Sequence, residues 1–369
     1  MTRITPELLT PAFDGQERRF SRAFAILEQA IAAKAFPGAS LAIVHGGKLV
    51  ALHGTGRFSY ERNATRVSRD AIYDLASLTK VVATTAMAML LFDRGALHLD
   101  SLVVGLLPEF AGEDHRRAEV TVRMLLTHTS GLPAYERLFL RFHTRDRLLA
   151  GAARVPLVHD PGRATEYSDI GFILVGEILS RLAGESLDSF CVREVFRPLG
   201  MEETMFRPQT NWLARIPPTE EDRDFRNGIV QGAVNDENAW ILGGVGGHAG
   251  LFSTAGDLAR FAQCMLAGGC GLISHDTTER FTIQDHTYPG STRFALGWDK
   301  PTAPSQSGQY FSPESYGHLG FTGTSLWIDP QRQLAVILLT NRTWPDRSSQ
   351  KIKEIRPAFH DAIVEALQS

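Results

Sequence analysis

The chain has 369 residues, of which 43% are hydrophobic and 21% charged, a composition typical of a folded globular protein with more than one core. Its formal net charge of −3 excludes the strongly basic surface that nucleic-acid binding needs, so no nucleic-acid partner is expected. The N-terminus up to Phe20 has no apolar signal core, and no uncharged apolar run of about 18 residues occurs, so we expect a cytoplasmic protein without a membrane partner.

The cysteines and histidines do not form a metal-binding pattern. Cys191, Cys264 and Cys270 lack the paired spacing of a zinc site or a redox motif, and one is left over from any pairing. We therefore expect buried free thiols in a reducing compartment, and no metal or cofactor.

Strands are predicted near both ends of the chain. A helix over residues 16–35 is followed by apolar runs at 39–44 and 49–54, and the glycine-rich turn between these runs predicts a hairpin. Further strands are predicted at residues 72–73, 294–298, 316–320, 324–329 and 334–340, before a closing helix over 350–367.

Helices predominate between the two groups of strands. Residues 77–91 are apolar on nearly every side, which predicts a helix buried in the middle of the molecule. Strands at both ends predict one α/β domain built from residues 1–75 and 281–369, with a mainly helical insertion over 76–280 and an active-site cleft between them. Further helices are predicted at residues 120–126, 145–153, 170–182, 187–196 and 254–266.

The buried helix begins with a serine and a lysine three residues apart. Ser77 and Lys80 share a helix face, and a hydroxyl beside an amine is a nucleophile with its activator. A buried lysine is costly unless it pairs or loses its proton. The alternative is a plain helix start with a snorkelling lysine. Ser348 and Lys351 have the same spacing, but they lie in a charged stretch that predicts a solvated surface.

Two later segments can supply the remaining chemistry. Tyr167 precedes the helix at 170–182, and a phenol near an ammonium can accept a proton from a serine; otherwise Tyr167 is a core aromatic residue. Residues 317–324 form a glycine-rich strand end that lets a ligand approach the backbone, or else a bent edge strand. We interpret His128, in a Thr/Ser/Gly-rich turn, as structural.

Taken together, these segments resemble a known family. In chain order, Ser77-x-x-Lys80, Tyr167-x-Asp169 and His318-x-Gly320 resemble the three motifs of the penicillin-recognising serine hydrolases. The branch is that of class C β-lactamases, D-Ala-D-Ala carboxypeptidases and their esterase relatives. Residues 125–132 and 248–254 add to the resemblance. The resemblance implies an α/β (α+β) fold of the class C β-lactamase type, an antiparallel sheet flanked by helices with an inserted all-helical domain.

The resemblance also implies a mechanism. Ser77 would attack a carbonyl group and form an acyl-enzyme. Lys80 and Tyr167 would share the role of general base, and Tyr167 would later protonate the leaving group. The backbone N–H groups of Ser77 and Phe321 would form the oxyanion hole.

Two positions depart from the family pattern. Asp169 stands where the family usually has asparagine, and a carboxylate there would keep Lys80 charged, which favours Tyr167 as the proton acceptor. His318 replaces a lysine that helps lactamases and peptidases bind the substrate carboxylate. Because a largely neutral histidine attracts anions less, we expect an ester or amide substrate without that carboxylate rather than efficient β-lactam hydrolysis.

Residues 235–239, followed by residues 243–248, resemble a subgroup of this family that includes enzymes of cell-wall recovery. Some of these enzymes cut the amide between N-acetylmuramic acid and its peptide. Asn235, Asp236 and His248 would then line the substrate side of the cleft. Alternatively, the glycines at 243–247 fold a tight loop that His248 caps.

The sequence therefore predicts a serine hydrolase that cleaves a carboxylic ester or amide, with a muropeptide amide or a D-amino-acid peptide among the candidates. Two alternatives stay open: a weakly catalytic or non-catalytic binding or sensor protein with an acylatable serine, and a β-lactamase. Turnover of a simple ester separates an enzyme from a sensor. The oligomeric state is not predicted.

Overall fold

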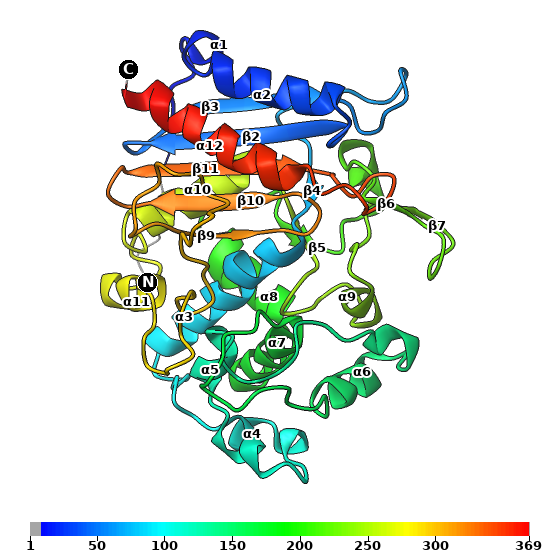
Figure 1. Cartoon of the computed structure of the whole chain (residues 1–369), viewed down its shortest axis with the longest axis vertical. Helices are drawn as coiled ribbons and strands as arrows, with labels where there is room; N and C mark the ends of the chain where they lie inside the picture. The colour runs from blue at the N-terminus through cyan, green and yellow to red at the C-terminus, as the bar shows by residue number, and fades with distance from the viewer. Residues whose placement is uncertain (1–8, 369) are drawn as a thin grey trace.

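The computed structural model describes residues 9–368 and is organised around a six-stranded sheet with the order β1–β3–β2–β11–β10–β9 (Figure 1). All neighbouring strands are antiparallel except β1 and β3. The two ends of the chain meet where β2 pairs with β11, with Leu334 opposite His45 and Thr340 opposite Ala39. The strands are β1 (Thr10–Pro11), β2 (Gly38–His45), β3 (Lys48–Gly56), β9 (Tyr316–Leu319), β10 (Ser325–Asp329) and β11 (Leu334–Thr340).

Helices cover both faces of this sheet. After the short α1 (Gln16–Arg19), α2 (Ser21–Ala32) packs with α12 (Ile352–Gln368) on one face. On the other face, α10 (Ala255–Leu266) contacts β2 and β11. Both faces are buried because alternate residues of β11 enter different apolar clusters, and this explains why its sequence is apolar throughout. The expected antiparallel sheet flanked by helices is confirmed.

The remaining helices lie beyond one edge of the sheet, where α3, α5, α7 and α8 pack together (Figure 1). α10 lies inside the stretch 76–280 that we expect to be an insertion, yet it packs on the sheet, so this stretch contributes to both layers. The exact division of the chain into domains stays a prediction. The helices are α3 (Ala86–Asp93), α4 (Val103–Leu106), α5 (Val122–Leu126), α6 (Arg145–Ala152), α7 (Asp169–Ala183), α8 (Leu187–Cys191), α9 (Glu237–Ile241) and α11 (His275–Thr282).

Two small sheets border these helices. β4 (Tyr73–Asp74) and β5 (Met205–Phe206) pair with β8 (Leu251–Ser253). β6 (Glu220–Asp222) pairs with β7 (Gly228–Val230). The first of these sheets delivers the chain to Ser77 directly after β4.

The segment at Ser77 is buried as predicted, but it is not one regular helix. A 3-10 turn over Ala76–Leu78 leads into a π-helical segment over Lys80–Thr85, and only then does α3 begin. Ala76 has a left-handed φ of 47°, which is unusual for a residue with a side chain. The stretch Ala76–Asp93 has the length and hydropathy of a membrane span, but 83% of it is buried inside the protein, as in a core helix.

One predicted strand is wrong. Residues 294–298 are irregular, and Gly297 has a φ of 88°, a conformation that no regular strand contains. The side chain of Thr85 fills the space where a Cβ atom at Gly297 would lie. This close approach requires glycine and explains the break in the pattern.

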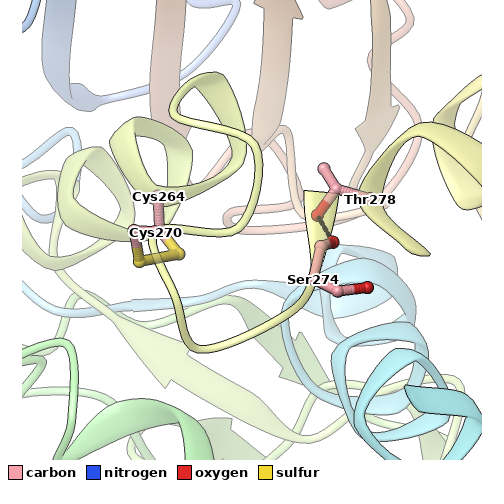
Figure 2. Close-up of a disulfide and its surroundings, with 4 residues drawn as sticks. All are labelled: Cys264, Cys270, Ser274 and Thr278. Carbon is pink, nitrogen blue, oxygen red and sulfur yellow. Dashed lines mark hydrogen bonds between the residues drawn. A yellow bond between two sulfur atoms is a disulfide. The ribbon is translucent and has the colours of Figure 1, made fainter. Parts of the chain in front are cut away.

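The prediction of three free thiols is also wrong for two of them. Cys264, near the end of α10, forms a disulfide with Cys270, and Figure 2 shows the bond at the turn that leads toward Ser274. Cys191 is free and buried. A turn that brings two cysteines together across five intervening residues is a tertiary feature that spacing alone does not reveal.

A disulfide is typical of oxidising compartments, so the cysteines no longer support a cytoplasmic location, which remains a prediction. The absence of a secretory leader is likewise still a prediction, because residues 1–8 lie outside the described part of the chain.

Candidate active site

The first two motifs meet around one buried ammonium group. The Nζ atom of Lys80 donates to Oγ of Ser77 at 2.9 Å, to Oδ1 of Asp169 at 2.6 Å and to the carbonyl oxygen of His248 at 3.2 Å. The predicted proximity of Ser77 and Lys80 is thus present, and it arises where 3-10 and π-helical turns adjoin. Asp169 reaches the pair because it opens α7, whose N-terminal N–H groups also favour a carboxylate.

The charges around Lys80 keep it protonated. Complete burial lowers the pKa of the ammonium, but the carboxylate of Asp169 and the hydroxyl of Tyr167 outweigh burial, so the pKa lies above its ordinary value. Lys80 is therefore a cation that orients and polarises the serine at neutral pH. This state agrees with the expectation drawn from Asp169.

Tyr167 lies beside both members of the pair. The Lys80 ammonium is 4.9 Å from the centre of its ring, and hydrogen bonding to Lys80 and Ser77 favours the phenolate. Burial is the larger effect and raises the pKa of Tyr167 to about 12, so the phenol is neutral at ordinary pH.

His128 holds the segment that carries Tyr167. Its Nδ1 accepts from the backbone N–H of Ser168 at 3.0 Å, and its carbonyl oxygen accepts from that of Glu166 at 2.9 Å. The imidazole ring also packs on the ring of Tyr167, with centroids 4.7 Å apart. Burial and the nearby Lys80 hold the pKa of His128 well below its usual range, so Nδ1 stays available as an acceptor. The structural role predicted for His128 is present, but it acts on Tyr167 rather than only within its own turn.

The third motif is tied directly to the segment before Ser77. Thr322 Oγ1 donates to the carbonyl oxygen of Asp74 at 2.8 Å, and Thr324 Oγ1 donates to that of Leu75 at 2.9 Å. Phe321 follows Gly320 in this loop and lines the same cavity as Ser77. Gly320 is required here, because a Cβ atom would overlap the side chain of Thr324.

His318 lies beneath this loop on β9 and is neutral. Its Nδ1 lies 2.8 Å from the carbonyl oxygen of Leu319, so the hydrogen of the neutral ring is placed on Nδ1. Burial and then the charge of Lys80 lower the pKa of His318 to about 3. The buried Nε2 has no hydrogen-bond partner among the described residues, which leaves an acceptor near the cavity.

Asn235, Asp236 and His248 reach the cavity from another direction, and their hydrogen bonds are largely structural. The Asn235 amide donates to Glu220 at 3.1 Å. Asp236 caps α9 and lies 2.8 Å from Nε2 of His248. His248 has features of both interpretations, the substrate-side residue and the loop cap. It lines the cavity, and its ring contacts Asp236 while its own carbonyl oxygen accepts from Lys80.

A cavity of about 590 Å³ collects the predicted residues. Lys80 is fully buried and is not among the residues that line it. The others line it: Ser77, Tyr167, Asp169, Asn235, Asp236, His248, His318, Gly320 and Phe321.

Several charged residues of the cavity were not predicted. Arg293 and Asp299, which flank the irregular segment 294–298, form an ion pair. The other unpredicted bases are Arg342, Arg347, Lys353 and Arg356. The sequence signal for this second group is the run of basic residues over 342–356. Such a run is typical of a solvated surface, and only the fold places these side chains at the cavity. Ser348 and Lys351 are exposed, as predicted.

No metal ligand set accompanies these residues. Among residues 9–368, no group of three or more His, Cys, Asp or Glu side chains is placed to hold a metal ion. The arrangement instead offers a hydroxyl, an ammonium, a phenol and a loop whose backbone borders the cavity, which are the parts needed for acyl transfer.

Sequence comparison agrees with this fold. A model of the Beta-lactamase family matches residues 24–356, and the chain belongs to this family of serine hydrolases. The chain is 33% identical over 355 residues to the N-acetylmuramyl-L-alanine amidase of Bacillus subtilis (strain 168), covering 86% of this chain and 79% of that protein. It is 32% identical over 344 residues to a protein of Escherichia coli O157:H7 named as a D-alanyl-D-alanine carboxypeptidase, covering 83% and 79% respectively.

Solved structures share the fold. EstCE1, described as a hydrolase with promiscuous acyltransferase activity, superposes with a TM-score of 0.76 at 22% identity, covering 94% of this chain and 99% of EstCE1. A penicillin-binding protein homologue from Caulobacter crescentus superposes with a TM-score of 0.75 at 21% identity, covering 94% and 97%.

Proposed function

We propose that this protein hydrolyses a carboxylic ester or amide through an acyl-enzyme on Ser77. The observation that carries the proposal is the hydroxyl of Ser77, a residue that lines a cavity of about 590 Å³, at 2.9 Å from the buried ammonium group of Lys80. Lys80 is held by Asp169 and therefore acts as a fixed positive charge rather than as the base.

In the acylation step, Oγ of Ser77 bonds to the carbonyl carbon of the substrate. The serine proton passes to the oxygen of Tyr167, while the phenolic proton of Tyr167 passes to the departing oxygen or nitrogen. This relay suits a phenol whose pKa of about 12 keeps it neutral. The negative charge on the carbonyl oxygen is stabilised by the backbone N–H groups of Ser77 and Phe321.

In the deacylation step, water bonds to the acyl carbon and the bond to Ser77 breaks. Tyr167 returns a proton to Oγ of Ser77 as it takes one from the water. The products are the free acid and the regenerated enzyme, so no cofactor is consumed.

Among natural substrates, we propose an amide of a cell-wall muropeptide. The support is the identity with the muramyl amidase over most of both chains. The neutral His318 argues against efficient β-lactam hydrolysis, because it offers no positive charge where the resemblance expects a lysine.

The test is a parallel assay of p-nitrophenyl butyrate, nitrocefin and an N-acetylmuramoyl peptide, with mass spectrometry of the protein during turnover. We expect turnover of the ester and of the muropeptide, little turnover of nitrocefin, and an acyl adduct on the peptide that contains Ser77. Absence of both turnover and adduct would overturn the proposed enzyme, whereas an adduct without turnover would favour the sensor.

A further inference from the structure

Asp74 is a buried carboxylate that the proposed acyl transfer does not use. It is the last residue of β4, directly before the segment that carries Ser77, and only 1% of it is exposed. Its Oδ1 atom accepts from the backbone N–H of Ala76 at 2.8 Å, and its Oδ2 atom accepts from that of Asn235 at 2.6 Å. One carboxylate therefore joins the segment before Ser77 to the segment that reaches the cavity at Asn235.

The bond to Ala76 holds an unfavourable backbone conformation. Ala76 has a left-handed φ of 47°, which costs free energy in a residue other than glycine. Ala76 also begins the 3-10 turn that contains Ser77. Because the Ser77 N–H belongs to the peptide group directly after Ala76, the conformation of Ala76 sets the direction of that N–H.

The backbone of Asp74 also contacts the loop that carries Phe321. The carbonyl oxygen of Asp74 accepts from Oγ1 of Thr322, and Thr322 directly follows Phe321. The contacts of Asp74 therefore end one residue away from each of the two proposed oxyanion donors, Ser77 and Phe321.

The fold disfavours the charge that Asp74 carries. Burial is the largest effect and, with the charge of Asp236, raises the pKa of Asp74 to about 6. The two N–H donors and the charge of Arg226 oppose this shift only in part. Because folding raises this pKa, the ionised carboxylate lowers the stability of the protein at neutral pH. An ion that the fold disfavours stands directly before the nucleophile, which points to a role in catalysis rather than in stability.

We propose that Asp74 is a positioning residue that fixes the oxyanion hole, by holding the Ser77 N–H in a set orientation toward the loop of Phe321. The inference rests on the proposed acyl transfer and deepens it. Asp74 does not line the cavity, so it acts through its neighbours. It keeps the Ser77 N–H directed at the carbonyl oxygen of the substrate, where negative charge develops. Because this charge is largest in the transition state, the contribution of Asp74 falls on kcat rather than on KM.

The test is Asp74→Asn, which keeps the size of the side chain but replaces one acceptor oxygen with a donor. We expect kcat for p-nitrophenyl butyrate, per folded protein, to fall at least about tenfold with KM nearly unchanged. Phenylboronic acid bonds through boron to a serine oxygen and becomes a negatively charged tetrahedral adduct that resembles the transition state. Its affinity should fall by a similar factor.

Asp257→Asn is the matched control. Asp257, on α10, is a second buried carboxylate, and burial also raises its pKa to about 6. It accepts from the backbone N–H of Glu203 at 2.8 Å and from the hydroxyl of Thr204 at 2.9 Å, and it does not line the cavity. Its replacement should leave kcat and the affinity for phenylboronic acid unchanged.

The wild-type enzyme supplies a second test that does not depend on the folding of a variant. Protonation of Asp74 imitates Asp74→Asn, so kcat should fall as the pH is lowered through about 6. The two charged groups that act on Asp74 keep their charges in this range. Burial raises the pKa of Asp236, but its contact with His248 outweighs burial and keeps the pKa below its usual value. Arg226 is a permanent cation. The fall in kcat should be absent in Asp74→Asn and retained in Asp257→Asn.

A loss of kcat and of phenylboronic acid affinity that is confined to Asp74→Asn supports the inference. Full kcat in Asp74→Asn, equal losses in the two variants, or a loss of kcat with unchanged affinity for phenylboronic acid would overturn it. If Asp74→Asn does not fold, a wild-type kcat that is constant between mildly acidic and neutral pH overturns the inference, and a fall that Asp257→Asn retains supports it. The acyl-enzyme proposal stands through all of these outcomes as long as Ser77→Ala abolishes ester hydrolysis, so the two proposals fail separately.

Discussion

The ammonium group of Lys80 and the carboxylate of Asp169 form a 2.6 Å ion pair with the lysine completely buried. The pair decides the charge state of the site. Burial alone would favour a neutral amine able to accept the proton of Ser77. With Asp169 in place the amine stays protonated, and the proton path moves to Tyr167.

Asp169→Asn should therefore change the pH dependence of catalysis. Without the carboxylate, burial dominates and the pKa of Lys80 falls, so kcat/KM for p-nitrophenyl butyrate should rise with pH as Lys80 loses its proton. The wild-type enzyme should show no such rise at neutral pH, because its Lys80 pKa lies above the ordinary value.

The same substitution should also destabilise the fold, by about 3 kcal/mol where Lys80 remains charged and by less at higher pH. Urea unfolding at two pH values measures this difference. Asp146→Asn, an exposed acidic residue in the first turn of α6, is the control. An unchanged pH profile in Asp169→Asn would show that the pair does not set the charge of Lys80.

Ser77→Ala should reduce kcat about a thousandfold or more, because it removes the hydroxyl that we propose bonds to the substrate and that lies 2.9 Å from the Lys80 ammonium. Ser348→Ala removes the serine of the second Ser-x-x-Lys pattern, which is exposed, and should retain the full rate. Steady-state ester hydrolysis measures both, and full activity of Ser77→Ala would refute the nucleophile assignment.

Tyr167→Phe should lower kcat about a hundredfold to ten-thousandfold, since it removes the proton relay but keeps the ring. Tyr135→Phe is the matched control, because Tyr135 lines the same cavity with its hydroxyl 3.4 Å from Glu237 rather than near Ser77. Burst kinetics should place the loss in Tyr167→Phe in the chemical steps. Equal losses in the two variants would argue against the relay.

His128 should act as a positioning residue. His128→Ala removes the acceptor for the Ser168 N–H and the ring that supports Tyr167, so kcat should fall about tenfold or more with little change in KM. His128→Asn should restore part of kcat, because asparagine tolerates the φ of 57° and has a side-chain acceptor. A loss of thermal stability without any change in kcat of the folded variants would limit His128 to a structural role.

Reduction of the Cys264–Cys270 disulfide should lower the free energy of unfolding by about 2 kcal/mol, because the bond closes a short loop. The loop leads to Ser274, whose backbone N–H and hydroxyl both bond to Asp93 at the end of α3 at 2.6 Å. Denaturant unfolding with and without dithiothreitol measures the change. The double variant Cys264→Ser/Cys270→Ser should be insensitive to dithiothreitol, and equal stability of the oxidised and reduced wild type would contradict the prediction.

The pattern of side chains predicted most of the sheet. The bounds of β11 agree with the predicted strand at 334–340, and the hairpin of β2 and β3 forms around its glycine turn. These elements are predictable because local period and turn chemistry agree with the final packing. The prediction of a strand at 294–298 was wrong because this segment contains a close contact between Gly297 and Thr85, which are far apart in the sequence.

The residues of the candidate site also divide into those that local sequence predicts and those that it does not. Ser77 and Lys80 were predictable because both lie within one helical turn, and their later partners were identified only through a resemblance in motif order. His128 and Arg356 were not identified as parts of the site. His128 belongs to a turn and Arg356 to a run of charged residues. Neither sequence pattern predicts which groups the side chain contacts in the folded protein.

The sequence by itself determined the strands near both ends of the chain, the buried segment at Ser77 and the proximity of its serine to a lysine, because these depend on periodicity and on neighbours within one turn. Only the tertiary structure decided that Asp169 lies 2.6 Å from Lys80, that two cysteines are joined, and that Arg342 and Arg356 flank the loop at Phe321. Those relationships join residues distant along the chain, and burial then determines their energies.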